Sequence, residues 1–356
     1  MKVTDFKDSV TPAGEFPEDI KWIDVREAPF SVHGVFYDES IKKFARLPRD
    51  VASATSSNVN YLSLFTAGGR IRFRTDSRYV GIYAVMTDGE SKTTCQMDHG
   101  LDLSHYDEHF GRETYAYSFV PPSKLKGGFS AGFYTDGKMK DYVLHLPTNG
   151  EVHELYVGLK ADADVLSATP YKHQKPVVYY GSSITQGACA SRPANIYEAI
   201  VSRRLDTDFI DLGFGGSCLG ESAIVNYMAT LDASVFVCDY DHNAPNAEYL
   251  ERTHPVIYRT LRAANPTLPI VFISAPNIMP DYTWHIPRRE VIRRTYEAAI
   301  AAGDDNVYFI DGETFFDIPD RDMCTVDSCH PNDLGMYLIA NKVTEVLDGI
   351  LNGENA

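Results

Sequence analysis

The residues of this chain with the clearest potential for chemistry are a serine, a histidine and an aspartate that lie far apart in the sequence. Ser183 follows the apolar run 177–180, and His330 lies three residues after Asp327. A neutral imidazole within hydrogen-bond reach activates a serine hydroxyl as a nucleophile, and a carboxylate on its other nitrogen stabilises the imidazolium. These residue types predict acyl-transfer chemistry. The alternative for Ser183 is an N-capping serine in a polar strand-to-helix turn.

Two further turns could supply hydrogen-bond donors to a developing oxyanion. Gly216 lies in a glycine-rich turn after an apolar segment, where backbone amides are unobstructed by side chains, although the same pattern suits a simple tight turn. Asn243 follows the next apolar segment, and its side-chain NH2 donates without a charge. We interpret its neighbours Asp239 and His242 as structural residues with satisfied partners.

These residues need a scaffold, and the second half of the chain provides one. Apolar, β-favouring segments alternate with helical patterns; the five segments are 177–180, 209–214, 234–240, 268–274 and 307–311. This alternation predicts a doubly wound, flavodoxin-like parallel sheet with helices on both faces. The candidate residues follow strands one, two, three and five, so the carboxyl ends of these strands would gather them at one edge.

Residues 1–172 show a different pattern, with short strand-like segments between Gly, Asp, Asn and Pro clusters. The segments are 69–75, 79–86, 131–134, 141–146 and 152–159. They predict an antiparallel β-sandwich of jelly-roll type. Arg72 and Arg74 alternate with apolar residues, which predicts a strand with one wet face. A polar linker near residue 172 divides the 356 residues into two predicted domains, 1–172 and 173–356.

Three residues are weaker candidates for substrate binding. Asp102 lies in the polar and aromatic run 100–107, which suits either a functional loop or a turn held by Asx hydrogen bonds. Trp284 and His285 lie in a loop after the fourth strand segment, where aromatic rings could stack on a sugar, line an acyl pocket or simply pack.

Composition excludes several classes of function. The formal net charge of −16 argues against nucleic acid or an anionic membrane as a partner. The start has no signal-peptide core, no run is long enough to span a membrane, and the six cysteines lack the spacing of a disulfide framework or zinc site. We therefore expect a cytoplasmic protein with reduced thiols, and the acyl-transfer chemistry predicted for Ser183 and His330 implies neither a metal nor an organic cofactor. Whether it forms a homo-oligomer is open.

The second half resembles the SGNH (GDSL-type) hydrolases, whose four motif blocks carry a Ser, a Gly, an Asn and a His. The resemblance implies that Ser183 is the nucleophile and that Asp327 and His330 form the Asp-x-x-His block. It also implies that Gly216, Asn243 and the backbone NH of Ser183 form the oxyanion hole.

The resemblance extends into the first half. The run 100–103, Gly-Leu-Asp-Leu, fits four of five positions of a Gly-x-Asp-Leu-Tyr run, with Ser104 in place of the Tyr. That run marks the sandwich domain of a bacterial two-domain subgroup. Two departures occur in the catalytic blocks: Ser182 replaces the Asp of Gly-Asp-Ser, and Asn243 lies in Asp-His-Asn-Ala rather than Gly-x-Asn-Asp.

The resemblance implies a serine esterase that hydrolyses short-chain esters through an acyl-enzyme. Acetyl esters of carbohydrates are the expected substrates, as small molecules or oligosaccharides. One alternative is a general short-chain carboxylesterase or lysophospholipase. The alternative outside enzymes is a sugar-binding protein with a relic active site.

Overall fold

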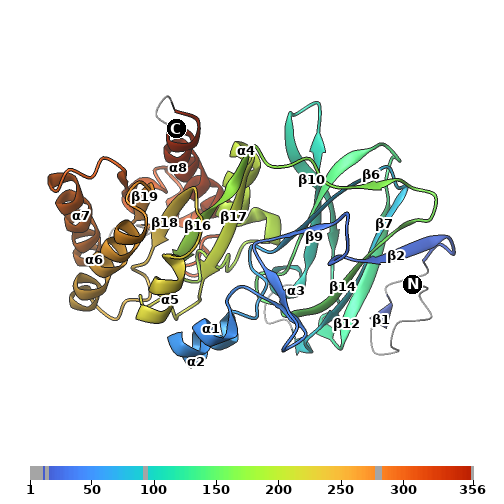
Figure 1. Ribbon diagram of the computed structural model, residues 1–356, viewed down its shortest axis with the longest axis horizontal. Coiled ribbons are helices and arrows are strands. Elements are labelled where there is room, and N and C mark those ends of the chain that lie inside the picture. Colours follow the sequence, from blue (N-terminus) through green and yellow to red (C-terminus); the bar gives the residue numbers. More distant parts are fainter. Residues whose placement is uncertain (1–10, 13–15, 91–94, 277–282, 354–356) are drawn as a thin grey trace. The chain divides into compact units, whose positions relative to one another are not determined.

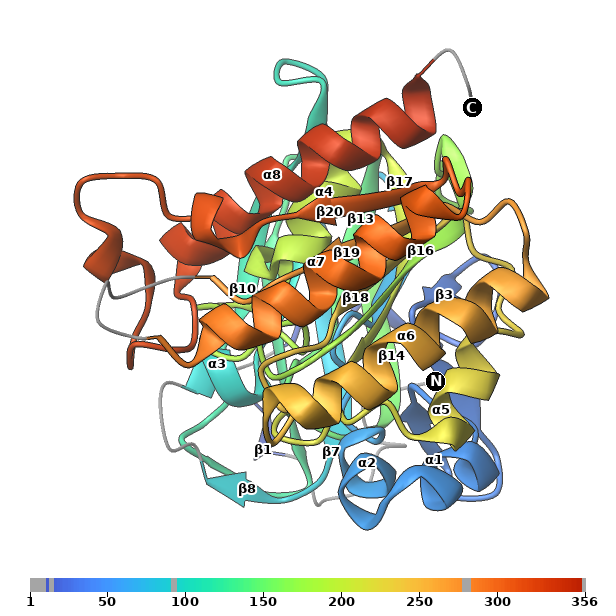
Figure 2. The ribbon, with the colours of Figure 1, turned by 90° about the vertical axis from the view of Figure 1, so that its left-hand side faces the viewer.

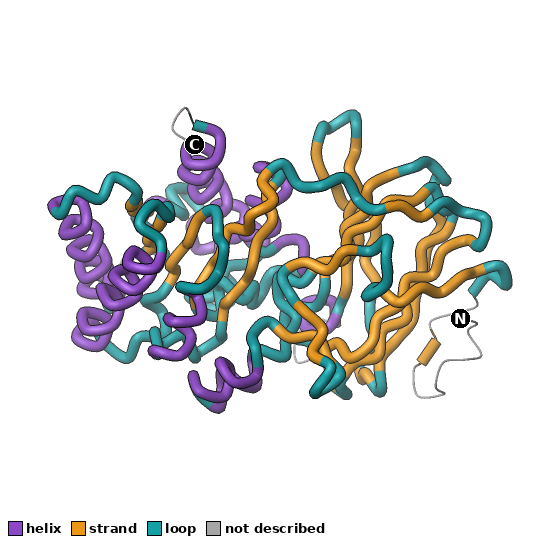
Figure 3. Tube along the Cα trace, viewed as in Figure 1, coloured by secondary structure: helices purple, strands orange, loops and turns teal. Residues whose placement is uncertain are grey.

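The computed structural model describes residues 11–12, 16–90, 95–276 and 283–353. The chain forms two compact units: the first joins Met1–Arg46, Leu64–Pro170 and Ser191–Ala194, and the second joins Leu47–Ser63, Tyr171–Ala190 and Asn195–Ala356. Strands dominate the described part of the first unit, whereas the second mixes strands and helices (Figures 1 and 3). The predicted division after residue 172 stays a prediction about the domains.

The first unit contains two facing sheets. One has the order β1 (Thr11–Pro12), β12 (Gly128–Tyr134), β7 (Tyr79–Met86), β14 (Val152–Lys160) and β2 (Ile20–Asp24). The other has the order β10 (Arg112–Phe119), β9 (Leu101–Asp107), β13 (Lys140–His145), β6 (Arg70–Thr75) and β15 (Val165–Leu166), with β3 (Ser31–His33) also paired to β6. Their pairings are antiparallel except for β1 with β12. Shorter elements are β4 (Phe36–Asp38), β5 (Lys43–Ala45), β8 (Gly89–Glu90), α3 (Cys95–His99) and β11 (Lys124–Leu125).

Alternate residues of the two sheets form one apolar core. Ile71 and Phe73 of β6 meet residues of the facing sheet such as Ile82 and Ala84 of β7, and all four are fully buried. Each large apolar side chain buried in this way contributes about 1.5–3 kcal/mol. The predicted antiparallel sandwich is therefore confirmed.

The prediction of one wet face on β6 is wrong for Arg72. Arg74 is exposed, but Arg72 is only 8% exposed and its Nη2 donates to the Thr169 carbonyl at 2.9 Å. Arg70 is also buried and donates to the Gly68 carbonyl. Backbone carbonyls take the place of water here, because buried guanidinium groups need hydrogen-bond acceptors. The period of the pattern alone does not reveal these acceptors.

The second unit is built on a five-stranded parallel sheet. Its order is β17 (Thr207–Gly213), β16 (His173–Gly181), β18 (Val235–Asp239), β19 (Ile270–Ile273) and β20 (Val307–Ile310). The helices between and after the strands are α4 (Tyr197–Leu205), α5 (Ser222–Met228), α6 (Ala247–Ala264), α7 (His285–Ala301) and α8 (Asp333–Asn352). The predicted doubly wound sheet is confirmed.

The strands present alternate residues to helices on opposite faces. Val177 and Tyr179 of β16 pack in one apolar cluster with α4 and α8. Val178 and Tyr180 pack in a second cluster with α5, α6 and α7. Figure 2 shows these two helix layers. A strand buried on both faces explains why the apolar runs in the sequence are nearly continuous.

Two short helices within the predicted sandwich domain were missed. They are α1 (Arg49–Thr55) and α2 (Ser57–Leu62), and the Ser56 hydroxyl caps α2 by accepting from the Val59 amide. Ala52 and Val59 are buried in the cluster that contains α5, so these helices belong to the second unit. Within the described ranges, no helix has both the length and the apolar content of a membrane span.

Candidate active site

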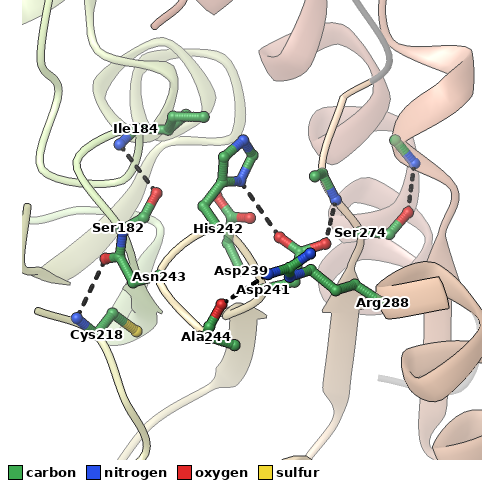
Figure 4. A network of polar contacts seen from close by, with 12 residues as sticks. Ser182, Ile184, Cys218, Asp239, Asp241, His242, Asn243, Ala244, Ser274 and Arg288 are labelled. Carbon is green, nitrogen blue, oxygen red and sulfur yellow. Dashed lines mark hydrogen bonds and ion pairs between the residues drawn. The ribbon is translucent and has the colours of Figure 1, made fainter. Parts of the chain in front are cut away.

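Residues 181–187 form the turn that carries Ser183, the candidate nucleophile, and are called the nucleophile turn below; the turn directly follows β16, which lies between β17 and β18 in the sheet. Strand β16 ends at Gly181, where an added Cβ would lie 2.0 Å from Thr185 Oγ1 and 2.7 Å from the Asp239 carbonyl, so no larger residue fits. The buried Ser182 hydroxyl accepts from the Ile184 amide at 3.2 Å and shapes the turn (Figure 4). Ser183 itself is partly exposed.

The structure brings Ser183 and His330 together across 147 positions of sequence. Ser183 Oγ lies 2.8 Å from His330 Nε2, and His330 Nδ1 lies 2.7 Å from Asp327 Oδ2. The second Asp327 oxygen accepts from the backbone amides of Cys329 and His330, at 3.1 and 2.7 Å. The Asp-x-x-His spacing thus forms a closed local turn that orients the imidazole.

The same turn keeps Asp327 ionised. Burial opposes ionisation, but hydrogen bonds from the His330 backbone and ring and attraction to the ring hold the pKa of Asp327 below its usual value. At neutral pH the carboxylate is therefore available to accept from His330 Nδ1, which leaves Nε2 facing Ser183. The Asn332 side chain then caps α8 by accepting from the amides of Leu334 and Gly335, which fixes the end of the loop.

The glycine-rich turn after β17 packs against the nucleophile turn. A Cβ added at Gly213 would lie 2.1 Å from the Gln186 nitrogen, and one at Gly215 would lie 3.4 Å from Ser183 Cβ. Gly216 has a φ of +68° and is exposed, with open space where a Cβ would stand. A left-handed conformation favours glycine at this position whatever the space.

Asn243 lies after β18 and is oriented by its oxygen. Its Oδ1 accepts from the Cys218 amide at 3.2 Å, as Figure 4 shows. With the carbonyl end of the amide engaged in this way, the NH2 end remains as the donor. Cys218 is the residue that sequence reasoning missed here, because its contribution is a backbone amide.

Behind these turns lies a buried group made of Asp239, Asp241 and His242 (Figure 4). His242 Nδ1 lies 3.3 Å from Asp241 Oδ1, and Asp241 Oδ2 accepts from the Ala275 amide at 2.7 Å. Burial lowers the pKa of His242, but hydrogen bonds with Asp241 and Cys329 and the charges of both carboxyl groups outweigh it and raise the pKa to about 10. Burial raises the pKa of Asp239 to about 7, against the attraction of His242 and a hydrogen bond from Thr185.

This buried group is also where a metal would find ligands among the described residues, since its ligand atoms lie within 4.8 Å of one another. His242 Nδ1 already faces Asp241 Oδ1 at 3.3 Å, and Asp241 Oδ2 accepts from the Ala275 amide, so these ligand atoms are engaged with one another and with the backbone. The residues therefore fit an internal ion pair better than a metal site.

The structure does not bring all of the weaker candidates into the site. Asp102 is fully buried in the first unit, and both of its oxygens accept from groups of the chain itself. His285 is 3% exposed and its Nε2 lies 3.5 Å from Glu313 Oε1. Trp284 differs, because it is 40% exposed and its ring lies 5.4 Å from that of His242. Only Trp284 of the three offers an accessible surface.

Gln186 is a site residue that sequence reasoning passed over. Its side chain is nearly buried, and Oε1 accepts from the Gly215 amide at 2.9 Å. It therefore links the turn that carries Ser183 to the turn that carries Gly216. The sequence offered one signal, which is an amide side chain within the small-residue turn 181–187. Its hydrogen-bond partner could not be predicted, because Gly215 lies 29 residues away.

Comparison with family models agrees with this geometry. Residues 174–348 match the GDSL-like Lipase/Acylhydrolase family. Residues 20–165 match the GxDLY family, which is described as the N-terminus of Esterase_SGNH_hydro-type proteins. The chain belongs to the GDSL-like lipases and acylhydrolases of SGNH type, in the arrangement that carries this N-terminal domain. The predicted family is confirmed. Comparison with curated proteins finds no match.

Solved structures share the fold over nearly the whole chain. One is a protein from Bacteroides ovatus ATCC 8483 that is described as a GDSL-like lipase and is 26% identical to this chain. Its TM-score is 0.82, and the match covers 94% of this chain and 98% of that one. A salicylyl-acyltransferase from a tetracycline biosynthetic pathway is 20% identical, with a TM-score of 0.76 over 94% and 99%. An active-site mutant of a family two carbohydrate esterase from Clostridium thermocellum is 14% identical, with a TM-score of 0.60 over 91% and 98%.

Proposed function

We propose that this protein hydrolyses carboxylic esters through an acyl-enzyme on Ser183, and that its substrates are short-chain esters, acetyl above all, of carbohydrates. The observation that carries the proposal is the unbroken chain of hydrogen-bond distances from Ser183 Oγ to His330 Nε2 and from His330 Nδ1 to Asp327. Family membership supports the reaction class.

In this mechanism His330 takes the Ser183 proton while the hydroxyl oxygen attacks the ester carbonyl. The imidazolium that forms is stabilised by Asp327, whose depressed pKa keeps it a carboxylate. His330 then gives the proton to the departing alcohol, and the acyl group stays on Ser183. Water attacks the acyl-enzyme with His330 again as the base, which releases the acid and restores the serine.

We assign the oxyanion contacts to the backbone amides of Gly216 and Ser183 and to the Asn243 NH2. Two observations support this assignment: the turn of Gly216 packs on the nucleophile turn, and the Cys218 amide holds the Asn243 oxygen. A donor of this kind lowers the barrier by about 3 kcal/mol when it faces the developing charge.

Two solved structures and one side chain support the carbohydrate substrate class. Two proteins that share the fold are a family two carbohydrate esterase and an acetyl xylan esterase from Butyrivibrio proteoclasticus. Because of this likeness, we put sugar acetates first in the panel of substrates to be tested. Trp284 is the side chain we assign to stacking on a sugar ring, since it is the accessible aromatic beside His242.

A second fate of the acyl-enzyme is transfer to an alcohol instead of water. The same His330 would deprotonate the alcohol, so the residues do not distinguish the two outcomes. Because a salicylyl-acyltransferase shares the fold, the assay must include an alcohol as a possible acceptor of the acyl group. A relic site is disfavoured because the three catalytic candidates remain in hydrogen-bond geometry.

The test is acetate release from a panel of acetylated oligosaccharides, with p-nitrophenyl acetate, butyrate and octanoate alongside and with a sugar alcohol added as acceptor in a parallel series. We expect release by the wild type to fall by several orders of magnitude in Ser183→Ala. Ser234→Ala is the matched control, because Ser234 lies just before the amino end of β18 rather than at the carboxyl edge of the sheet.

Each outcome decides something. Equal rates in the wild type and Ser183→Ala would remove Ser183 as nucleophile. Cleavage of p-nitrophenyl acetate through Ser183, without release from any sugar, would keep the ester chemistry and discard the carbohydrate assignment. Strong activity on the octanoate would favour a general carboxylesterase or lysophospholipase, and a transferred acetyl group would favour an acyltransferase.

A further inference from the structure

The loop after the nucleophile turn is divided between the two units. Residues up to Ala190 and from Asn195 onward belong to the second unit, whereas Ser191–Ala194 belong to the first. The loop begins four residues after Ser183 and ends at α4, passing through a short 3-10 turn at Pro193–Asn195. Residues 191–194 are therefore expected to have contacts with other residues of the first unit.

The group that holds them is the carboxylate of Asp102. It lies on β9, which pairs on its two sides with β10 and β13, and the side chain is fully buried. Asp102 Oδ2 accepts from Arg192 Nη1 at 2.5 Å, and Oδ1 accepts from the Ala194 amide at 3.0 Å. A buried carboxylate is stable only when its oxygens are paired, so this aspartate selects one arrangement of the segment.

Arg192 completes the contact from the other side. Its guanidinium lies 4.7 Å from the centre of the Tyr115 ring, and only 20% of its side chain is exposed. The ion pair with Asp102 and the cation–π contact with Tyr115 leave the guanidinium little freedom. Both partners of Arg192 lie on neighbouring strands of one sheet, which gives the segment a rigid support.

One end of the loop contacts the backbone of Ser183, and the other contacts a residue close to His330 in sequence. At its start, the Ala188 amide donates to the Ser183 carbonyl at 2.9 Å. At its end, Asn195 Nδ2 donates to Asp333 Oδ2 at 3.0 Å, three residues after His330. Cys189, between them, has a φ of +69°, a conformation that a residue other than glycine keeps only when its surroundings impose it.

We propose that Asp102 and Arg192 are positioning residues for catalysis. By holding residues 191–194, the pair fixes the loop that connects the Ser183 turn to the start of α4 and keeps Ser183 in line with His330. The inference rests on the proposed serine hydrolase function. It also gives a physical role to the Gly-Leu-Asp-Leu run, whose buried aspartate holds another segment of the chain.

The test compares Asp102→Asn with the wild type. We expect kcat for p-nitrophenyl acetate to fall about ten- to hundredfold with KM changed little, because a small misplacement of a reacting group costs about this much. The rate at which diethyl p-nitrophenyl phosphate inactivates Ser183 should fall by the same factor. Amide hydrogen exchange of residues 187–196 should become faster.

Glu151→Gln is the matched control, because it also breaks an ion pair of a buried carboxylate in the first unit. Glu151 is 8% exposed and its Oε2 lies 2.6 Å from Lys43 Nζ. We expect it to lower the Tm without lowering kcat. If Asp102→Asn does not fold, Arg192→Gln carries the same measurements, since Arg192 is partly exposed, and Arg192→Lys should recover part of the kcat.

The outcomes separate this inference from the proposed function. A wild type without Ser183-dependent turnover contradicts the proposed function, and the inference falls with it. An active wild type with an equally active Asp102→Asn, and with unchanged exchange in residues 187–196, contradicts only the inference. An equal loss of kcat in Glu151→Gln would show a general loss of stability and would also overturn it.

Discussion

The second unit contains two histidine–aspartate pairs near the same sheet edge, and they differ in almost every physical respect. His330 is 28% exposed, and its ring contacts Asp327 on one nitrogen and Ser183 on the other. His242 is 6% exposed, and it lies beside Asp241, whose own side chain is fully buried. The first pair is open to a substrate, and the second is closed.

Burial decides what each pair can do. A buried imidazole between two carboxyl groups keeps its proton at neutral pH, because its pKa is raised to about 10, and it therefore cannot act as a base there. An imidazole facing a serine hydroxyl and solvent can take and return a proton. His242 nevertheless contacts Cys329, the residue before His330, so the closed pair supports the loop that carries the open one.

The largest expected effect on activity comes from His330→Ala. We expect kcat to fall on the order of 10⁴- to 10⁶-fold, because in the proposed mechanism His330 is both the base and the acid of the two half-reactions. The Tm should shift by no more than about 3 °C, since the ring is partly exposed. Ester turnover and thermal melting measure the two effects. His109→Ala, at an exposed loop histidine, should change neither.

The reverse pattern is expected for His242→Gln. Removing the cation leaves two buried carboxyl groups without their partner, and breaking a buried ion pair costs about 3–5 kcal/mol. A raised pKa contributes stability that is complete below the ordinary value of about 6.5 and is lost as the pH rises through about 10. The difference from wild type in urea unfolding should therefore shrink between pH 6 and pH 10. If His242→Gln lowered kcat as much as His330→Ala does, the idea that the His242 pair acts on stability and not on catalysis would be wrong.

Asp239 lies beside the closed pair and provides a pH test of the same buried group. Its pKa is raised to about 7, so the folded state binds a proton more tightly than the unfolded state. The associated stability is complete below the ordinary pKa near 3.8 and is lost as the pH rises through about 7. The loss is up to about 4 kcal/mol, since one pKa unit corresponds to about 1.4 kcal/mol. Urea unfolding at pH 5 and pH 8 should show a smaller pH dependence in Asp239→Asn than in the wild type.

The smallest effect is expected at Gln186, between the two turns of the open site. Gln186→Met keeps the length of the side chain but removes the acceptor for the Gly215 amide, and a hydrogen bond of this kind contributes about 1 kcal/mol. We expect kcat to fall about tenfold with KM unchanged. Gln186→Glu retains an acceptor and should keep most of the kcat. Equal losses in both variants would indicate general disruption of the turn.

Much of the fold was predictable because its signals are local. Continuous apolar runs predicted the parallel strands, and the helical periods between them predicted helices on both faces. The Asp327–His330 contact was also within reach of sequence reasoning, because three residues of one turn suffice to form it. The catalytic roles of these residues stay predictions until the variants are measured.

The sequence by itself determined the features that a few consecutive residues specify. These are the turn that carries Ser183, the Asp-x-x-His turn and the alternation of strand and helix. Only the tertiary structure decided that residues 49–62 form helices on the second unit, that Arg72 is buried, and that Asp102 holds residues 191–194. In each case the partner is distant in sequence, and burial of a polar or amphipathic group depends on whether that partner satisfies it. A local pattern shows that such a group is present, and the partner that folding brings to it decides its role.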